Sequence, residues 1–276
     1  MHRFSQVDVF SPDPLLGNPV AVVHDADALS DKQMATFARW TNLSETTFLL
    51  TPTSADADYR LRIWTPAGEL PFAGHPTLGS AHAWLQAGGA PSADEVVVQE
   101  CAAGLVTVRR GDRLAFEAPP LLRSGPVSAA DLEAISRALR VSVSDVVDAA
   151  WVDNGPGWVA VLLDSAAAVL DCRPDFAAFG GFEIGIVGEY AAGESDADVE
   201  VRAFVPDMGI GEDPVTGSLN AGIAQWLAGT RLPASYVASQ GTVLGRRGRV
   251  HIDSDGSVVW VGGETRTTVA GEVSLG

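Results

Sequence analysis

Two stretches decide how this chain folds: WTPAGELPFAGHPTLGSA at residues 64–81 and FVPDMGIGEDPVTGSLNAGIA at residues 204–224. Each has a strand-like start, then a turn-rich loop, then a glycine that opens a helix of small residues. Three small residues match between the stretches at one constant offset: Gly74 with Gly217, Gly79 with Gly222 and Ala81 with Ala224. The match predicts a chain made of two related halves, with a ligand in the cleft between them.

Short runs of Val, Ile, Leu and aromatic residues surround both stretches and are bounded by Gly, Pro, Asp and Ser, which is typical of strands. We expect strands at 5–10, 21–23, 47–50, 58–64, 96–100, 105–109, 114–117, 150–152, 158–163, 182–187, 199–204, 236–240, 249–252 and 258–261. Helices are expected at 30–40, from about residue 75, at 128–139 and at 217–227. Many strands with few long helices indicate an α+β fold. The Pro- and Gly-rich stretch 118–126 predicts a linker, so the expected domains are 1–122 and 123–276.

Composition and net charge exclude several classes of function. The chain has 276 residues, 46% of them hydrophobic, and a net charge of −17, so it builds a core and repels nucleic acid and anionic membranes. The two cysteines, Cys101 and Cys172, form no disulfide or zinc pattern, which suits a reducing compartment. No leader is visible and the apolar runs are strand-sized. We expect a soluble, cytoplasmic protein that needs no metal or other cofactor.

The two glycine-led helix starts are the first candidates for chemistry. Free N–H groups and the positive end of a helix dipole bind anions, and a bound carboxylate would have its α-carbon acidified by the same donors. The first start offers Gly74 and His75, and the second offers Asp213, Gly217 and Ser218. The alternative is that both glycines only permit tight turns.

Glu45 is the second candidate because it follows a helix and directly precedes an apolar strand. A carboxylate in that position is either a solvated edge residue or an acid–base group aimed into a cleft. His75, taken alone, is as compatible with a structural role as with a catalytic one. The Gly-x-Ser-x-Gly, P-loop and Rossmann patterns are missing from the sequence, so a serine hydrolase or a nucleotide enzyme has no support.

Four ordered motifs together resemble one family. They are DVF at 8–10 followed by GNPVAV at 17–22, NLSETTF at 42–48, FAGHPTLG at 72–79 and EDPVTGS at 212–218. In order and spacing they resemble the PhzF (phenazine-biosynthesis-like) isomerases, which share the diaminopimelate epimerase fold. The resemblance runs from about Val7 to Leu227.

The resemblance implies two pseudo-symmetric domains, each a curved, mostly antiparallel sheet around a central helix, with room for the chain's end to fold back onto the first domain. It also implies a homodimer and proton transfer without a cofactor. Glu45 resembles the family's catalytic acid–base, and His75 and Asp213 resemble groups that orient or protonate the substrate. The matching substrate-binding positions are Ser44, Gly74, Gly217 and Ser218.

One departure from the wider fold class bears on the mechanism. The related epimerases carry a cysteine before each helix glycine and use the pair as two bases, whereas this chain has Ala73 and Thr216. Neither side chain exchanges a proton at neutral pH, which leaves one carboxylate. We therefore expect an isomerase that moves a proton, and with it a double bond, in a small carboxylated substrate like trans-2,3-dihydro-3-hydroxyanthranilate. An epimerase or racemase with an unrecognised partner base and a non-catalytic binding protein remain alternatives.

Overall fold

The computed structural model describes residues 1–275 and divides into two compact units. Unit 1 holds residues 1–117 together with the chain from residue 262 onward, and unit 2 holds residues 118–261. This division differs from the expected 1–122 and 123–276 at both boundaries. The reason at the C-terminal end is strand pairing, because the last strand joins the sheet of unit 1.

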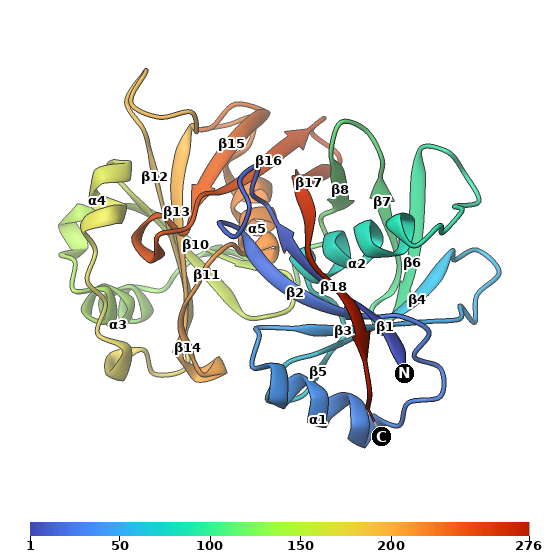
Figure 1. Ribbon diagram of the computed structural model, residues 1–276. Helices are drawn as coiled ribbons and strands as arrows, with labels where there is room; N and C mark the ends of the chain where they lie inside the picture. Colours follow the sequence, from blue (N-terminus) through green and yellow to red (C-terminus); the bar gives the residue numbers. More distant parts are fainter. Residues whose placement is uncertain (276) are drawn as a thin grey trace. The chain divides into compact units, whose positions relative to one another are not determined.

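Unit 1 is a mostly antiparallel sheet around a central helix (Figure 1). Its strands are β1(His2–Val9), β2(Asn18–Val23), β3(Thr46–Leu50), β4(Tyr59–Trp64), β5(Glu69–Leu70), β6(Val96–Cys101), β7(Gly104–Arg109), β8(Leu114–Glu117) and β18(Thr265–Val273), and its helices are α1(Asp31–Thr41) and α2(Gly74–Gln86). Among the strand pairs of unit 1, β2–β3 and β4–β6 are parallel. Helix α2 packs against β1, β2, β3, β6, β7, β8 and β18, and nine of its thirteen residues are buried.

Unit 2 repeats this arrangement. Its strands are β9(Arg123–Pro126), β10(Val146–Asp153), β11(Trp158–Leu163), β12(Glu183–Glu189), β13(Val199–Val205), β14(Ile210–Asp213), β15(Ser235–Gln240) and β16(Gly248–Ser254). Strand β17(Val259–Gly263) begins in unit 2, and its last two residues belong to unit 1. The helices of unit 2 are α3(Ala129–Leu139), α4(Ala166–Asp171) and α5(Gly217–Leu227). Short 3-10 helices lie at Val143–Asp145, Phe176–Ala178, Pro206–Met208 and Thr242–Leu244. Helix α5 packs against β10, β11 and β16 and buries eight of its eleven residues.

The pairing pattern confirms the predicted pseudo-symmetry. The parallel pairs β2–β3 and β4–β6 of unit 1 correspond to β11–β12 and β13–β15 of unit 2. Two strands show the same exchange in the two halves of the sequence. Strand β9 follows β8 of unit 1 along the chain but pairs with β10 of unit 2. Strand β18 follows β17 along the chain but pairs with β1 of unit 1.

Local sequence explains why helix α1 forms where it was expected. Ser30 accepts from the Gln33 N–H while the Gln33 side chain accepts from the Ser30 N–H, which is a capping box. Met34, Phe37 and Ala38 form its buried face and pack in a core cluster with Phe48. In the described part of the chain, no helix has both the length and the apolar character needed to cross a membrane.

Candidate active site

The first half-site, defined as Ser44, Glu45, Gly74 and His75, lies within unit 1. Helix α1 ends at Thr41, and its C-cap residue, Asn42, takes the left-handed conformation (φ 54°) and turns the chain toward β3. This places Glu45 just before the fully buried start of β3. Glu45 Oε2 lies 3.3 Å from His75 Nε2, and the two side chains are 15% and 5% exposed. The fold therefore joins two residues that are distant in sequence into one shielded pair.

Burial decides the charge of His75. Complete desolvation lowers the pKa of its imidazole to about 3, and a hydrogen bond with the Pro19 backbone raises the pKa by less. Ring atom Nδ1 lies 3.4 Å from the Asn18 side-chain nitrogen. An ionised Glu45 would favour a charged ring, but the loss of solvation outweighs that attraction for a side chain this deeply buried. At neutral pH the ring is neutral, so it can orient a partner but has no imidazolium proton to give.

Helices α2 and α5 begin differently from the other α-helices. Helices α1, α3 and α4 are capped by the side chains of Ser30, Ser128 and Ser165. In contrast, the N-cap residues of α2 and α5, Ala73 and Thr216, make no side-chain cap hydrogen bond. The first-turn N–H groups of α2 and α5 are therefore left uncapped, which suits them to binding an anion.

The second half-site, defined as Asp213, Gly217 and Ser218, lies within unit 2. Asp213 ends β14, and its Oδ2 accepts from the Thr216 hydroxyl at 2.5 Å. The buried Gln240 accepts from the Thr216 N–H at 3.0 Å and donates to the Thr216 hydroxyl at 2.9 Å. Because these bonds occupy the Thr216 hydroxyl, this otherwise good N-cap residue leaves its own helix open.

Ser218 has a defined partner of its own. Its Oγ accepts from Trp158 Nε1 at 3.0 Å, and its carbonyl accepts from the Asn154 side chain at 2.8 Å. His75 and Ser218 are each the second residue of their helix. The partners of these two residues also lie at similar places. Asn18, the partner of His75, is the first residue of β2 and follows a glycine. Trp158, the partner of Ser218, is the first residue of β11 and also follows a glycine.

The structure thus groups four predicted residues in unit 1 and three in unit 2. Sequence reasoning missed Gln240, Asn154 and Trp158, which hold the second half-site in place. In the sequence each of them is an uncharged polar or aromatic residue in or next to an apolar strand. Most residues of that kind belong to the hydrophobic core and have no part in a site.

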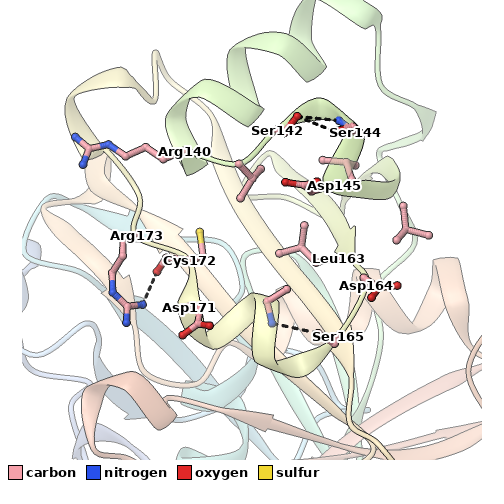
Figure 2. A pocket seen from close by; sticks show the side chains of 14 residues that line it. Arg140, Ser142, Ser144, Asp145, Leu163, Asp164, Ser165, Asp171, Cys172 and Arg173 are labelled. Carbon is pink, nitrogen blue, oxygen red and sulfur yellow. Dashed lines mark hydrogen bonds between the residues drawn. The ribbon is translucent and has the colours of Figure 1, made fainter.

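A surface groove of about 760 Å³ lies elsewhere in unit 2 (Figure 2). It contains none of the predicted site residues. The arginine side chains that line the groove already bind nearby protein groups. Arg140 pairs with Asp175, and Arg173 donates to the Leu170 and Cys172 carbonyls. Burial raises the pKa of the Cys172 thiol, which makes it unreactive. Within residues 1–275, no three His, Cys, Asp or Glu side chains are grouped so that they could hold a metal ion.

Comparisons with known proteins agree with this fold. The family model described as phenazine biosynthesis-like protein matches residues 7–275. The chain is 38% identical to "Antisense-enhancing sequence 1" of Schizosaccharomyces pombe, over 98% of each chain. It is 36% identical to the trans-2,3-dihydro-3-hydroxyanthranilate isomerase of Pseudomonas aeruginosa, over 93% of this chain and 92% of that relative.

A solved structure gives the same result for the fold. The crystal structure of a PhzF-family protein from Enterococcus faecalis superposes with a TM-score of 0.82 at 24% identity, covering 99% of each chain. That likeness shows the fold, and the curated relatives show the class of reaction. This chain belongs to the phenazine biosynthesis-like (PhzF) family and is an isomerase.

Proposed function

We propose that this isomerase moves a proton, and with it a double bond, within a small carboxylated, amino acid-like substrate such as trans-2,3-dihydro-3-hydroxyanthranilate. The observation that carries the proposal is the shielded Glu45–His75 pair at the open N-terminus of α2. The substrate class comes from the relative of Pseudomonas aeruginosa that carries that name.

In this mechanism Glu45 is the proton carrier. Its carboxylate removes a proton from a carbon next to the substrate's unsaturation, and the electron pair left behind delocalises to a second carbon, which is then protonated. Electrons are neither gained nor lost, so the step needs no redox cofactor. General acid–base catalysis of this kind contributes about 10²- to 10⁴-fold.

The remaining half-site residues bind and orient the substrate. Uncapped N–H groups at Gly74 and at Gly217–Ser218 suit a substrate carboxylate. The neutral His75 ring and the Asp213 carboxylate would orient the amino or hydroxyl substituent, and Ser44 adds a hydroxyl beside Glu45.

The proposal extends to assembly and location. A homodimer is supported by large apolar side chains on an otherwise acidic surface: Trp40 is 79% exposed and Leu122 is 74% exposed. The free thiols of Cys101 and Cys172 suit the reducing cytoplasm.

The test is Glu45→Gln, assayed in D₂O by NMR with trans-2,3-dihydro-3-hydroxyanthranilate. Gln keeps the shape of the side chain, but its amide cannot accept and return a proton at neutral pH. We therefore expect turnover to fall by about 10²- to 10⁴-fold. Affinity should change by less than about tenfold, since the helix N-termini carry the substrate carboxylate. Glu133→Gln, at an exposed position of α3, is the control and should behave as wild type.

The outcomes separate the alternatives. Deuterium at a new carbon with a shifted double bond supports the isomerase, and exchange with inversion supports an epimerase. Binding without exchange supports a non-catalytic protein. A Glu45→Gln variant that keeps more than about a tenth of wild-type turnover would contradict a mechanism with Glu45 as proton carrier.

A further inference from the structure

Gln240, the last residue of β15, is fully buried inside unit 2 and bonds through its whole side-chain amide. Its oxygen accepts from the Thr216 N–H at 3.0 Å and from the Asn220 side chain at 2.9 Å. Its nitrogen donates to the Asp213 carbonyl at 3.2 Å and to the Thr216 hydroxyl at 2.9 Å. A side-chain amide has two donors and two acceptor lone pairs. These four bonds use all of them, so the orientation of the amide is fixed.

That orientation decides where the Thr216 hydroxyl proton points. The hydroxyl oxygen accepts from the Gln240 nitrogen, and an amide nitrogen cannot accept in return. The hydroxyl therefore gives its own proton to Asp213 Oδ2, at 2.5 Å. A hydrogen bond from a hydroxyl to a carboxylate favours the ionised form of the carboxyl group and restricts its rotation.

Unit 1 shows what such a glutamine does for the fold alone. Gln99 lies on β6, the strand that corresponds to β15, and is also fully buried. Its side-chain nitrogen donates to the Thr77 hydroxyl at 3.1 Å. Thr77 is the fourth residue of α2, as Asn220 is the fourth residue of α5. A bond from this strand to the central helix is therefore common to both units and belongs to the fold.

The branch that reaches a carboxylate depends on the N-cap residue of the central helix. In unit 1 this residue is Ala73, which has no hydroxyl. In unit 2 it is Thr216, which is 8% exposed. A threonine at an N-cap ordinarily bonds the first turn of its own helix, but here its hydroxyl donates to Asp213. The hydroxyl thus serves the carboxylate of the second half-site in place of its helix.

We propose that Gln240 and Thr216 are positioning residues for Asp213: Gln240 directs the Thr216 hydroxyl proton onto the Asp213 carboxylate, which is thereby held ionised and in one orientation for the substrate. The inference rests on the proposed function, in which Asp213 orients a polar substituent of the substrate. It makes Asp213 a hydrogen-bond acceptor for that substituent and not its proton donor. All three residues lie within unit 2.

The first experiment follows the Asp213 carboxyl by NMR on ¹³C-aspartate-labelled protein and needs no substrate. Thr216→Val keeps the shape of the side chain and the backbone bond to Gln240 but removes the hydroxyl. The pH at which Asp213 titrates should therefore rise in Thr216→Val and stay at the wild-type value in Thr216→Ser. Gln240→Leu should raise it by less, because the hydroxyl can still turn to Asp213 but is no longer directed there.

Thr230→Val is the matched control, because the Thr230 hydroxyl lies beyond the other end of α5 and donates to the Leu227 carbonyl at 2.9 Å. It should leave the Asp213 titration unchanged. A titration of Asp213 that does not move in Thr216→Val, or does not move in Gln240→Leu, would overturn the inference.

Turnover of trans-2,3-dihydro-3-hydroxyanthranilate then tests whether the positioning matters for the reaction. Thr216→Val should lower kcat by about tenfold, the effect of one lost hydrogen bond to a charged group, and Thr216→Ser should restore it. Because Thr216 acts through Asp213, Thr216→Val should cause no further loss when Asp213 is already Asn. Losses that multiply would show an independent structural role and overturn the inference. If wild type does not convert the probe, the proposed function fails for that substrate, and the titration alone then decides whether Asp213 is positioned in this way.

Discussion

The neutrality of His75 makes a quantitative prediction about pH and stability. Its pKa is about 3 in the folded chain against 6.5 for an ordinary histidine, so between those values the unfolded chain binds a proton that the folded chain does not. Stability is therefore fully present above pH 6.5 and falls as the pH drops toward 3. Lowering the pH from 7.5 to 5.5 crosses one unit of this window, which corresponds to ~1.4 kcal/mol from this one side chain.

Urea unfolding of wild type and His75→Gln at pH 7.5 and 5.5 measures this contribution. Other groups titrate equally in both proteins, so the difference between the two pH-induced losses isolates His75. We expect wild type to lose about 1 to 1.5 kcal/mol more than the variant. Equal losses within about 0.5 kcal/mol, or a larger loss in the variant, would refute a neutral His75, and with it the proposal that this ring orients the substrate without protonating it.

Three further predictions concern packing, assembly and metals. Gly222→Ala should destabilise the protein by ~1–3 kcal/mol in urea unfolding, because the new Cβ would lie 2.4 Å from the Val152 carbonyl oxygen. Gly68→Ala, with nothing within 4 Å, is its control, and equal stability of the two variants would contradict the packing. Light scattering should give about twice the 28.8 kDa chain mass; a monomer would contradict the homodimer. Dialysis against a chelator should leave activity unchanged, and a loss restored by added metal would show a metal requirement.

Much of the fold could be predicted because local signals and packing agree. Strand β4 alternates buried and half-buried residues, and the capping box of α1 fixes where that helix starts, so both were visible in the sequence. Strand β18 was missed because most of its side chains face solvent and it pairs through backbone bonds with β1. Strand β9 was missed because its Gly125 and Pro126 are typical of turns. A strand that is mostly exposed, or one made of turn-forming residues, shows little of the hydrophobic pattern on which the prediction depends.

The sequence names candidate site residues but does not show their electrostatics. The motif around Glu45 named a candidate, yet only the folded chain shows its carboxylate 3.3 Å from His75 in a shielded position. The pKa of His75 depends on the burial of α2, and that burial comes from strands spread over the whole of unit 1.

The two helix starts show what the repeat preserves. In unit 1 the N-cap position is Ala73, which has no polar atom to place over the first turn. In unit 2 it is Thr216, which could cap but has its hydroxyl engaged by Asp213 and Gln240. Different side chains therefore reach the same result, an uncapped helix N-terminus in each unit. A free helix end costs about 1 kcal/mol relative to a capped one, and an uncapped N-terminus at both central helices is what the proposed binding of a substrate carboxylate predicts.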